Sequence, residues 1–154
     1  DGLWECRYPP PSESVPLGEP RAYVAEGDDD LLIVSWANGV HMSLQAREKL
    51  AGLGIRARVL DLRWLAPLPL AAIKLHAKAT GRVLVVDECR ASGGGPSAAI
   101  LAALAEDEDC REVSVRRIAG IDSYVPLAEA ANLVLVQPED VVRAAQALCS
   151  GVRT

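Results

Sequence analysis

The chain has 154 residues, of which 50% are hydrophobic and 24% are charged, and its formal net charge is −5. This composition is that of one folded domain and excludes a disordered or fibrous chain. The acidic balance and the scattered arginines argue against nucleic acid as a partner, because phosphate binding depends on clustered Lys and Arg. No apolar run reaches the roughly 18 residues that cross a bilayer, and the first residues lack the layout of a signal peptide. We therefore expect a cytoplasmic protein with no membrane partner.

The first twenty residues differ in composition from the rest of the chain. Residues 1–20 contain five of the ten prolines and show no regular hydrophobic period. Such a stretch is typical of a linker. We expect a proline-rich linker from an upstream domain at 1–20, one folded domain at 21–150 and a short tail at 151–154.

Strands and helices are expected to alternate from residue 21 onward. The first strand is expected at 21–27, and the apolar run 31–37 predicts a second strand that is covered on both faces. A helix is expected to open at Asn38 and Gly39, with apolar residues at helical spacing, and to close at glycines 52 and 54. A third strand is expected at 55–62.

The second half of the chain continues the pattern. Helices are expected at 67–79, 96–105, 125–135 and 137–148, and strands at 82–87 and 113–118. Repeated alternation with short connections predicts a mostly parallel sheet with helices on both faces. The expected fold class is therefore α/β, with a three-layer α/β/α architecture.

The glycine loop, residues 92–95, lies between a predicted strand and a predicted helix. Its sequence, "SGGGPSAA" from residue 92, fits neither G-x-G-x-x-G nor G-x-x-x-x-G-K-[ST]. Two interpretations remain: a phosphate cradle at a helix N-terminus, or a tight turn in which the glycines allow close packing and Pro96 begins the helix. The second is favoured.

Several polar residues are candidates for a cleft at the carboxyl ends of the strands, where open α/β sheets place ligands. Asp87 and Glu88 could act as acid and base there, although neighbouring strand residues point to opposite faces. His41 could face the same cleft, or be an ordinary surface histidine. Asp61 and Arg63 could form an ion pair or contribute to a ligand site.

The cysteines do not predict a metal centre. Cys6, Cys89, Cys110 and Cys149 are widely separated, without a C-x-x-C pair, and only two histidines accompany them. Buried or unused thiols in a reducing compartment are the favoured interpretation.

Several segments recur in a fixed order that resembles a known family. They are "VPLG" at 15–18, "DLRWLAPLP" at 61–69, "VDE" at 86–88, "SGG" at 92–94 and "PED" at 138–140. Over roughly residues 15–149, the chain closely resembles the C-terminal domain of the transketolase superfamily. Within it, the nearest type is the beta subunit, or fused alpha-beta chain, of the decarboxylating component of 2-oxoacid dehydrogenase complexes.

The resemblance implies a five-stranded mixed sheet between helices. It implies a parent enzyme that oxidatively decarboxylates a 2-oxoacid, either pyruvate or a branched-chain oxoacid, and acylates a lipoyl group. Thiamine diphosphate and magnesium would lie between the other domains, with none bound by this domain alone. Since the G-D-G motif of that site is missing here, no catalytic, cofactor-binding or metal-binding residue is assigned.

The same resemblance implies partners. The domain would pair subunits into a homo-oligomer, contact the other domains or subunit, and offer a surface to the lipoyl acyltransferase core. In the relatives an acidic residue just before this strand pairs with a basic domain of the core, and the resemblance makes Glu112, before the strand at 113–118, the candidate for this docking. A solvated turn carboxylate is the slightly favoured interpretation. Two alternatives remain open: a free-standing small-ligand or phosphate-binding enzyme that uses the 92–95 loop, and another transketolase-like enzyme.

Overall fold

The computed structural model describes residues 9–24 and 27–151. The strands are β1 (Arg21–Tyr23), β2 (Leu31–Ser35), β3 (Ala57–Asp61), β4 (Arg82–Arg90) and β5 (Ser114–Gly120). The α-helices are α1 (Asn38–Gly52), α2 (Leu70–Thr80), α3 (Pro96–Ala105) and α4 (Pro138–Cys149). Short 3₁₀ helices are η1 (Pro11–Glu13), η2 (Glu108–Cys110) and η3 (Ala128–Leu133). No described helix is both long and apolar enough to cross a membrane.

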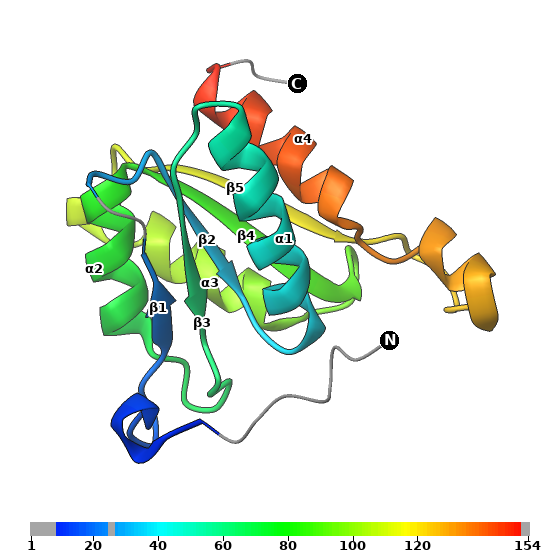
Figure 1. Ribbon diagram of the computed structural model, residues 1–154, viewed down its shortest axis with the longest axis horizontal. Helices are drawn as coiled ribbons and strands as arrows, with labels where there is room; N and C mark the ends of the chain where they lie inside the picture. Colours follow the sequence, from blue (N-terminus) through cyan, green and yellow to red (C-terminus); the bar gives the residue numbers. More distant parts are fainter. Residues whose placement is uncertain (1–8, 25–26, 152–154) are drawn as a thin grey trace.

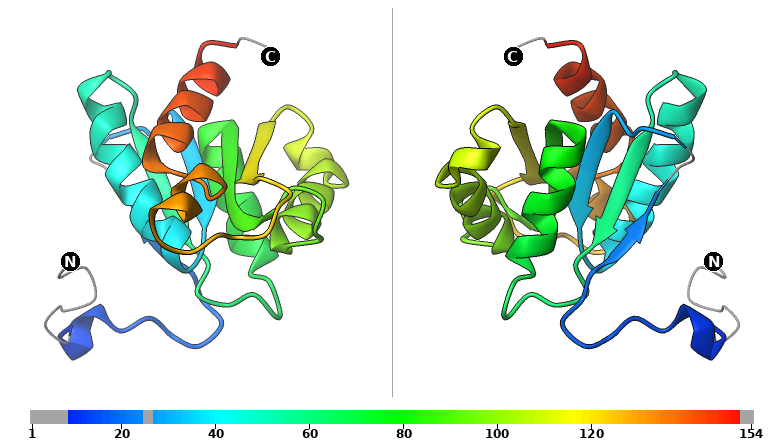
Figure 2. Two further views of the ribbon diagram at one scale, coloured as in Figure 1. Left: turned by 90° about the vertical axis from the view of Figure 1, so that its right-hand side faces the viewer. Right: turned by 90° about the vertical axis from the view of Figure 1, so that its left-hand side faces the viewer.

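The strands form one five-stranded sheet in the order β1-β3-β2-β4-β5. Strands β2 to β5 run parallel, and β1 pairs antiparallel with β3 at one edge. Helices α1 and α4 cover one face, while α2 and α3 cover the other (Figures 1 and 2). The predicted three-layer α/β/α fold with a mixed, mostly parallel sheet is therefore confirmed.

Strand β2 is apolar without interruption from Leu31 to Val34 because both of its faces are buried. Leu31 and Ile33 belong to the core beneath α1 and α4, whereas Leu32 and Val34 belong to the core beneath α2 and α3. Successive strand residues point to opposite faces, so a central strand covered on both sides must be apolar at every position. All four of these side chains have 0% exposure.

Some element boundaries differ from the sequence-based expectation. Strand β2 ends at Ser35, because Ala37 adopts a positive φ of 47° that no strand continues through. Strand β4 extends to Arg90, three residues beyond the expected end at 87. The expected helix at 125–135 is only the 3₁₀ helix η3, which has no buried residue, so no packing stabilises a longer α-helix there.

The predicted linker and tail lie partly outside the described residues. Positions 1–8 of the linker, which include Cys6, and 152–154 of the tail are not among them. Within the described part, η1 is exposed and its Glu13 forms an ion pair with Arg21 at 3.3 Å. The domain boundaries at 20 and 150 stay predictions.

Candidate functional site

Asp87 and Glu88 lie near the carboxyl end of β4, and they do not converge. Asp87 is 1% exposed and bonds toward α3, whereas Glu88 is half-buried and bonds toward α1. The alternation of side chains along a strand explains the separation. The pair is therefore not arranged as an acid and a base acting on one substrate atom.

The Asp87 carboxylate packs against the glycine loop. Its Oδ2 accepts a hydrogen bond from the Ser97 hydroxyl in the first turn of α3, and its Oδ1 accepts one from the Cys89 backbone N–H at 2.8 Å. A Cβ on Gly95 would lie 2.5 Å from that Oδ2 and 2.9 Å from the Cβ of Cys89. Gly95 is thus required for close packing, while Gly94 takes a positive φ of 61°.

The Glu88 carboxylate lies at the N-terminus of α1. Its Oε1 accepts a hydrogen bond from the backbone N–H of Gly39. Burial raises the pKa of Glu88, the Gly39 N–H partly offsets this, and the charge of Asp87 adds to the increase. A Cβ on Gly39 would lie 2.2 Å from Ser35 Oγ, so glycine lets α1 approach β2 closely.

These contacts decide between the two interpretations of the glycine loop. A diphosphate needs exposed N–H groups and positive charge around it. Here carboxylates lie beside the first turns of both α1 and α3, and they would repel an anion. Among residues 9–24 and 27–151, no group of three His, Cys, Asp or Glu side chains could hold a metal ion. The first turns of α1 and α3 therefore do not fit a diphosphate.

Asp61 is the last residue of β3, and His41, on α1, lies close enough to influence its carboxyl group. Burial raises the pKa of Asp61, and the effect is partly offset first by the backbone hydrogen bond from Arg63 and then by the nearby charges of Arg63 and Arg21. The backbone N–H of Arg63 donates to Asp61 Oδ1 at 3.2 Å. This bond closes a local turn at the end of the strand, so the candidate Asp61–Arg63 pair has a structural role.

His76, on α2, belongs to a chain of polar contacts near the amino end of β3. Arg58 links His76 to Asp29: Arg58 Nη1 lies 2.7 Å from His76 Nδ1, and Arg58 Nε donates to Asp29 Oδ2 at 2.7 Å. Because a guanidinium only donates, His76 Nδ1 must accept, and the ring must be neutral. Burial and then the charge of Arg58 lower the pKa of His76.

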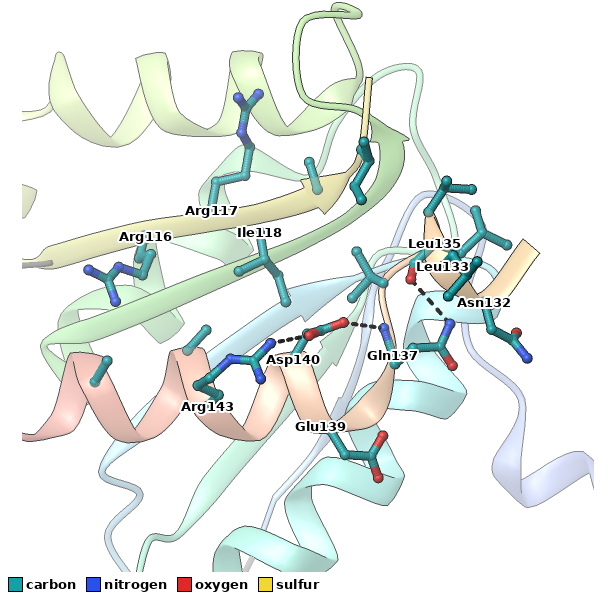
Figure 3. Close-up of a pocket in the computed structure, with 16 residues that line it drawn as sticks. Arg116, Arg117, Ile118, Asn132, Leu133, Leu135, Gln137, Glu139, Asp140 and Arg143 are labelled. Carbon is teal, nitrogen blue, oxygen red and sulfur yellow. Dashed lines mark hydrogen bonds and ion pairs between the residues drawn. The ribbon is translucent and has the colours of Figure 1, made fainter. Parts of the chain in front are cut away.

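A groove lies beside β5. It measures about 950 Å³ and lies between β5, α4 and the segment around η3 (Figure 3). Its wall is fixed by Asp140, which accepts hydrogen bonds from Arg143 and from the Gln137 backbone N–H at 2.9 Å. The Gln137 side chain in turn donates to Leu135 O at 3.1 Å.

Sequence reasoning missed this groove. The residues that line it come from segments 116–121, 132–137 and 139–147, and no single motif joins them. One signal was present: the strand at 113–118 is less apolar than the others, as expected of an edge strand with one incompletely covered side.

The chain matches known proteins along most of its length. Residues 21–141 match the family model "Transketolase, C-terminal domain". The chain is 36% identical over 138 residues to the pyruvate dehydrogenase E1 component subunit beta-1, mitochondrial, of Arabidopsis thaliana, covering 88% of this chain and 37% of that protein. It is 30% identical to the pyruvate dehydrogenase E1 component subunit beta of Staphylococcus epidermidis, covering 89% and 42%.

A solved structure agrees with these matches. A split gene transketolase, described as an inactive beta4 tetramer, superposes with a TM-score of 0.71 at 26% identity, covering 86% of this chain and 42% of that one. The chain thus spans about two fifths of the length of these relatives. The sheet, the ordered segments and these matches agree, and the chain belongs to the transketolase C-terminal domain family.

Proposed function

We propose that this chain is the C-terminal domain of the decarboxylating component of a thiamine diphosphate-dependent 2-oxoacid dehydrogenase. The observation that carries the proposal is the match, over 88% of the chain, to beta subunits of pyruvate dehydrogenase. The names of these relatives support pyruvate over a branched-chain oxoacid as the substrate. Because the chain spans about two fifths of its relatives, the oxidative decarboxylation and the acylation of a lipoyl group belong to the whole enzyme.

Thiamine diphosphate, with magnesium, would be held by parts of the enzyme other than this domain. The proposal is supported by the carboxylates of Asp87 and Glu88, which occupy the neighbourhood of two helix N-termini where a diphosphate would otherwise be favoured. We expect the isolated chain to show no heat of binding with the cofactor and magnesium in a calorimetric titration.

The decisive experiment measures the whole enzyme that contains this domain. We expect it to release CO₂ from labelled pyruvate in a reaction that requires thiamine diphosphate, and to transfer the acyl fragment to a lipoyl domain. Transfer of ketol groups between sugar phosphates, without CO₂ release from any 2-oxoacid, would overturn the proposal in favour of another transketolase-like enzyme.

The domain would also pair with other copies of the chain, contact the remaining domains or subunit, and dock to a lipoyl acyltransferase core. Self-association is supported by the split gene transketolase, which forms a beta4 tetramer. We place the enzyme in the cytoplasm. The free thiols of Cys89, Cys110 and Cys149 support a reducing compartment, although the plant relatives are named as mitochondrial.

Glu112 is our candidate for docking to the acyltransferase core. It is exposed, between η2 and β5, next to an acidic run. Within that run Asp107 and Asp109 pair with Lys74 and Lys78, whereas Glu112 forms no ion pair with another described residue. An exposed carboxylate of this kind can steer a basic partner, and its effect weakens with salt.

The docking proposal is tested by Glu112→Lys in the whole enzyme. We expect weaker binding to the core at low salt and unchanged decarboxylation by the free component. Glu48→Lys, an equal charge change at an exposed position of α1, is the matched control. Equal docking by wild type and Glu112→Lys across a salt series would reject the role of Glu112 while leaving the family assignment intact.

A further inference from the structure

A buried carboxylate oxygen near the amino ends of β2 and β3 lacks a hydrogen-bond partner. Asp29, two residues before β2, has a side chain that is 1% exposed, and its Oδ2 accepts a hydrogen bond from Arg58 Nε at 2.7 Å. Its Oδ1 is buried and accepts no hydrogen bond from any described residue. Buried polar atoms are almost always paired, and leaving an acceptor of a charged group unpaired is costly. Asp29 Oδ1 is therefore available to a further N–H donor.

Arg58 contacts this carboxylate and His76 at the same time. Arg58 lies near the start of β3, two residues before Leu60, so its side chain points to the face that α2 and α3 cover. Its Nη1 lies 2.7 Å from Nδ1 of His76 on α2. Because a guanidinium only donates, the ring is neutral in this contact and carries its proton on Nε2. The neutral ring thus attaches α2 to β3.

The charges around His76 come from the same two residues. Burial lowers the pKa of His76 most, the charge of Arg58 lowers it further, and the charge of Asp29 raises it. Strands β2 and β4 and helix α3 pack apolar core side chains against α2. The charged side chains between α2 and the residues around η2 are paired with each other, Lys74 with Asp107 and Lys78 with Asp109. A proton on His76 therefore acts on Arg58 and Asp29.

We propose that His76 is a proton-operated switch that attaches α2 to β3 when the ring is neutral and to the segment before β2 when the ring is charged. A proton from solvent bonds to the lone pair of Nδ1, which then no longer accepts from Arg58. The imidazolium and the guanidinium repel each other, and the new N–H donates to Asp29 Oδ1, the buried acceptor that is available. Arg58 keeps its hydrogen bond to Oδ2, so both cations share the carboxylate. This switch does not depend on the proposed decarboxylation.

The wild-type chain tests this exchange of partners by NMR. The sequence contains two histidines, so the variant His76→Gln assigns the signals of the His76 ring. At neutral pH we expect Nδ1 to carry no proton. Below the titration midpoint we expect a visible Nδ1–H signal, because a hydrogen bond to a buried carboxylate slows exchange with water, and we expect the Asp29 carboxyl carbon to shift with the same midpoint. A proton on Nδ1 at neutral pH, or a charged ring whose N–H protons exchange freely with water, would overturn the proposal.

A pair of variants tests the role of Asp29. Asp29→Asn keeps the shape of the side chain and removes the charge that favours the imidazolium, so we expect the His76 midpoint to move to lower pH by about 1 unit or more. Asp30→Asn is the matched control, because the Asp30 carboxylate pairs with Arg56 at 3.7 Å and is not among the groups that shift the pKa of His76. Its midpoint should equal that of wild type. Equal midpoints in wild type and a folded Asp29→Asn variant would overturn the switch.

The outcomes are independent of the proposed function. If Asp29→Asn does not fold, the ring and carboxyl signals of the wild-type chain still decide whether His76 exchanges partners. Failure of the switch leaves the family assignment intact, and CO₂ release from pyruvate by the whole enzyme remains a separate test.

Discussion

Gly39 offers a direct test of how α1 is attached to the sheet. The Cβ added by Gly39→Ala would lie 2.2 Å from Ser35 Oγ, which is buried and donates a hydrogen bond to Val86 O at 3.0 Å. Overpacking of this kind costs about 1 to 3 kcal/mol in the free energy of unfolding. The better helix propensity of alanine offsets up to about 1 kcal/mol of it. We expect a net loss of about 1 to 2 kcal/mol.

A second substitution isolates the clash. Ser35→Ala removes the hydroxyl and costs about 0.5 to 1.5 kcal/mol through the lost hydrogen bond. In the double variant the clash with Ser35 Oγ is gone, and the added Cβ lies 3.6 Å from the side-chain carbon of residue 35 and 3.6 Å from Glu88 Oε1, both ordinary contacts. Most of the cost of Gly39→Ala should therefore disappear when Ser35 is already alanine, which gives a coupling energy of about 1 kcal/mol or more.

The assay is urea unfolding of wild type, both single variants and the double variant, followed by far-UV circular dichroism. Gly52→Ala is the control within α1, because a Cβ there meets nothing within 4 Å; it should be neutral or stabilise by about 0.4 to 1 kcal/mol. Losses that add to within about 0.5 kcal/mol in the double variant would refute the reasoning, because independent sites add and a shared clash does not.

Three further predictions concern titratable groups. The pKa of Glu88 is raised in the folded state, so its contribution to the free energy of unfolding should be fully present below pH 4.5, the ordinary value, and lost as pH rises through the raised pKa. Urea titrations should show the stability of wild type falling relative to that of Glu88→Gln over this pH window. A constant difference in stability between the two proteins would contradict this. The pKa of His76 is lowered by burial and by Arg58, so its contribution to the free energy of unfolding should be fully present above pH 6.5 and lost as pH falls through the lowered pKa. Urea titrations of His76→Gln should show a smaller loss of stability over this pH range than those of wild type. Partial desolvation of the sulfur and then the Asp87 carboxylate raise the pKa of the Cys89 thiol, although the residue as a whole is exposed. Alkylation of Cys89, followed by mass spectrometry, should therefore be slower than alkylation of glutathione at neutral pH, and equal rates would exclude the effect.

Local periodicity predicted most helices and strands because burial of a helix face or of the two faces of a strand requires apolar residues at a regular spacing. The apolar run of β2 follows from coverage on both faces, and the helix beginning at Pro96 follows from proline's fixed φ and missing N–H. The 125–135 segment was predicted as a helix because its alanines and leucines fit helical spacing. It lacks a surface to pack on, which no local pattern reveals.

The roles of the polar residues depended on contacts between distant segments. Glu88 bonds to Gly39, 49 residues away, and Ser35 bonds to the carbonyl of Val86, 51 residues away. The sequence placed Asp87 and Glu88 at the correct edge of the sheet, but only the folded chain shows that each carboxylate attaches a different helix. The groove could not be predicted for the same reason, since β5, α4 and residues 132–137 meet only after folding.

The strand order also bears on how the chain is assembled during synthesis. The first parallel strand to emerge from the ribosome, β2, is the central one, β3 joins it on one side, and β4 and then β5 are added on the other. Each newly made parallel strand can therefore pair with a strand that has already been made, and no strand has to be inserted between two that are already paired. Only β1 emerges before its neighbour β3 exists. At three residues it exposes little unpaired backbone while it waits, which limits mispairing between nascent chains.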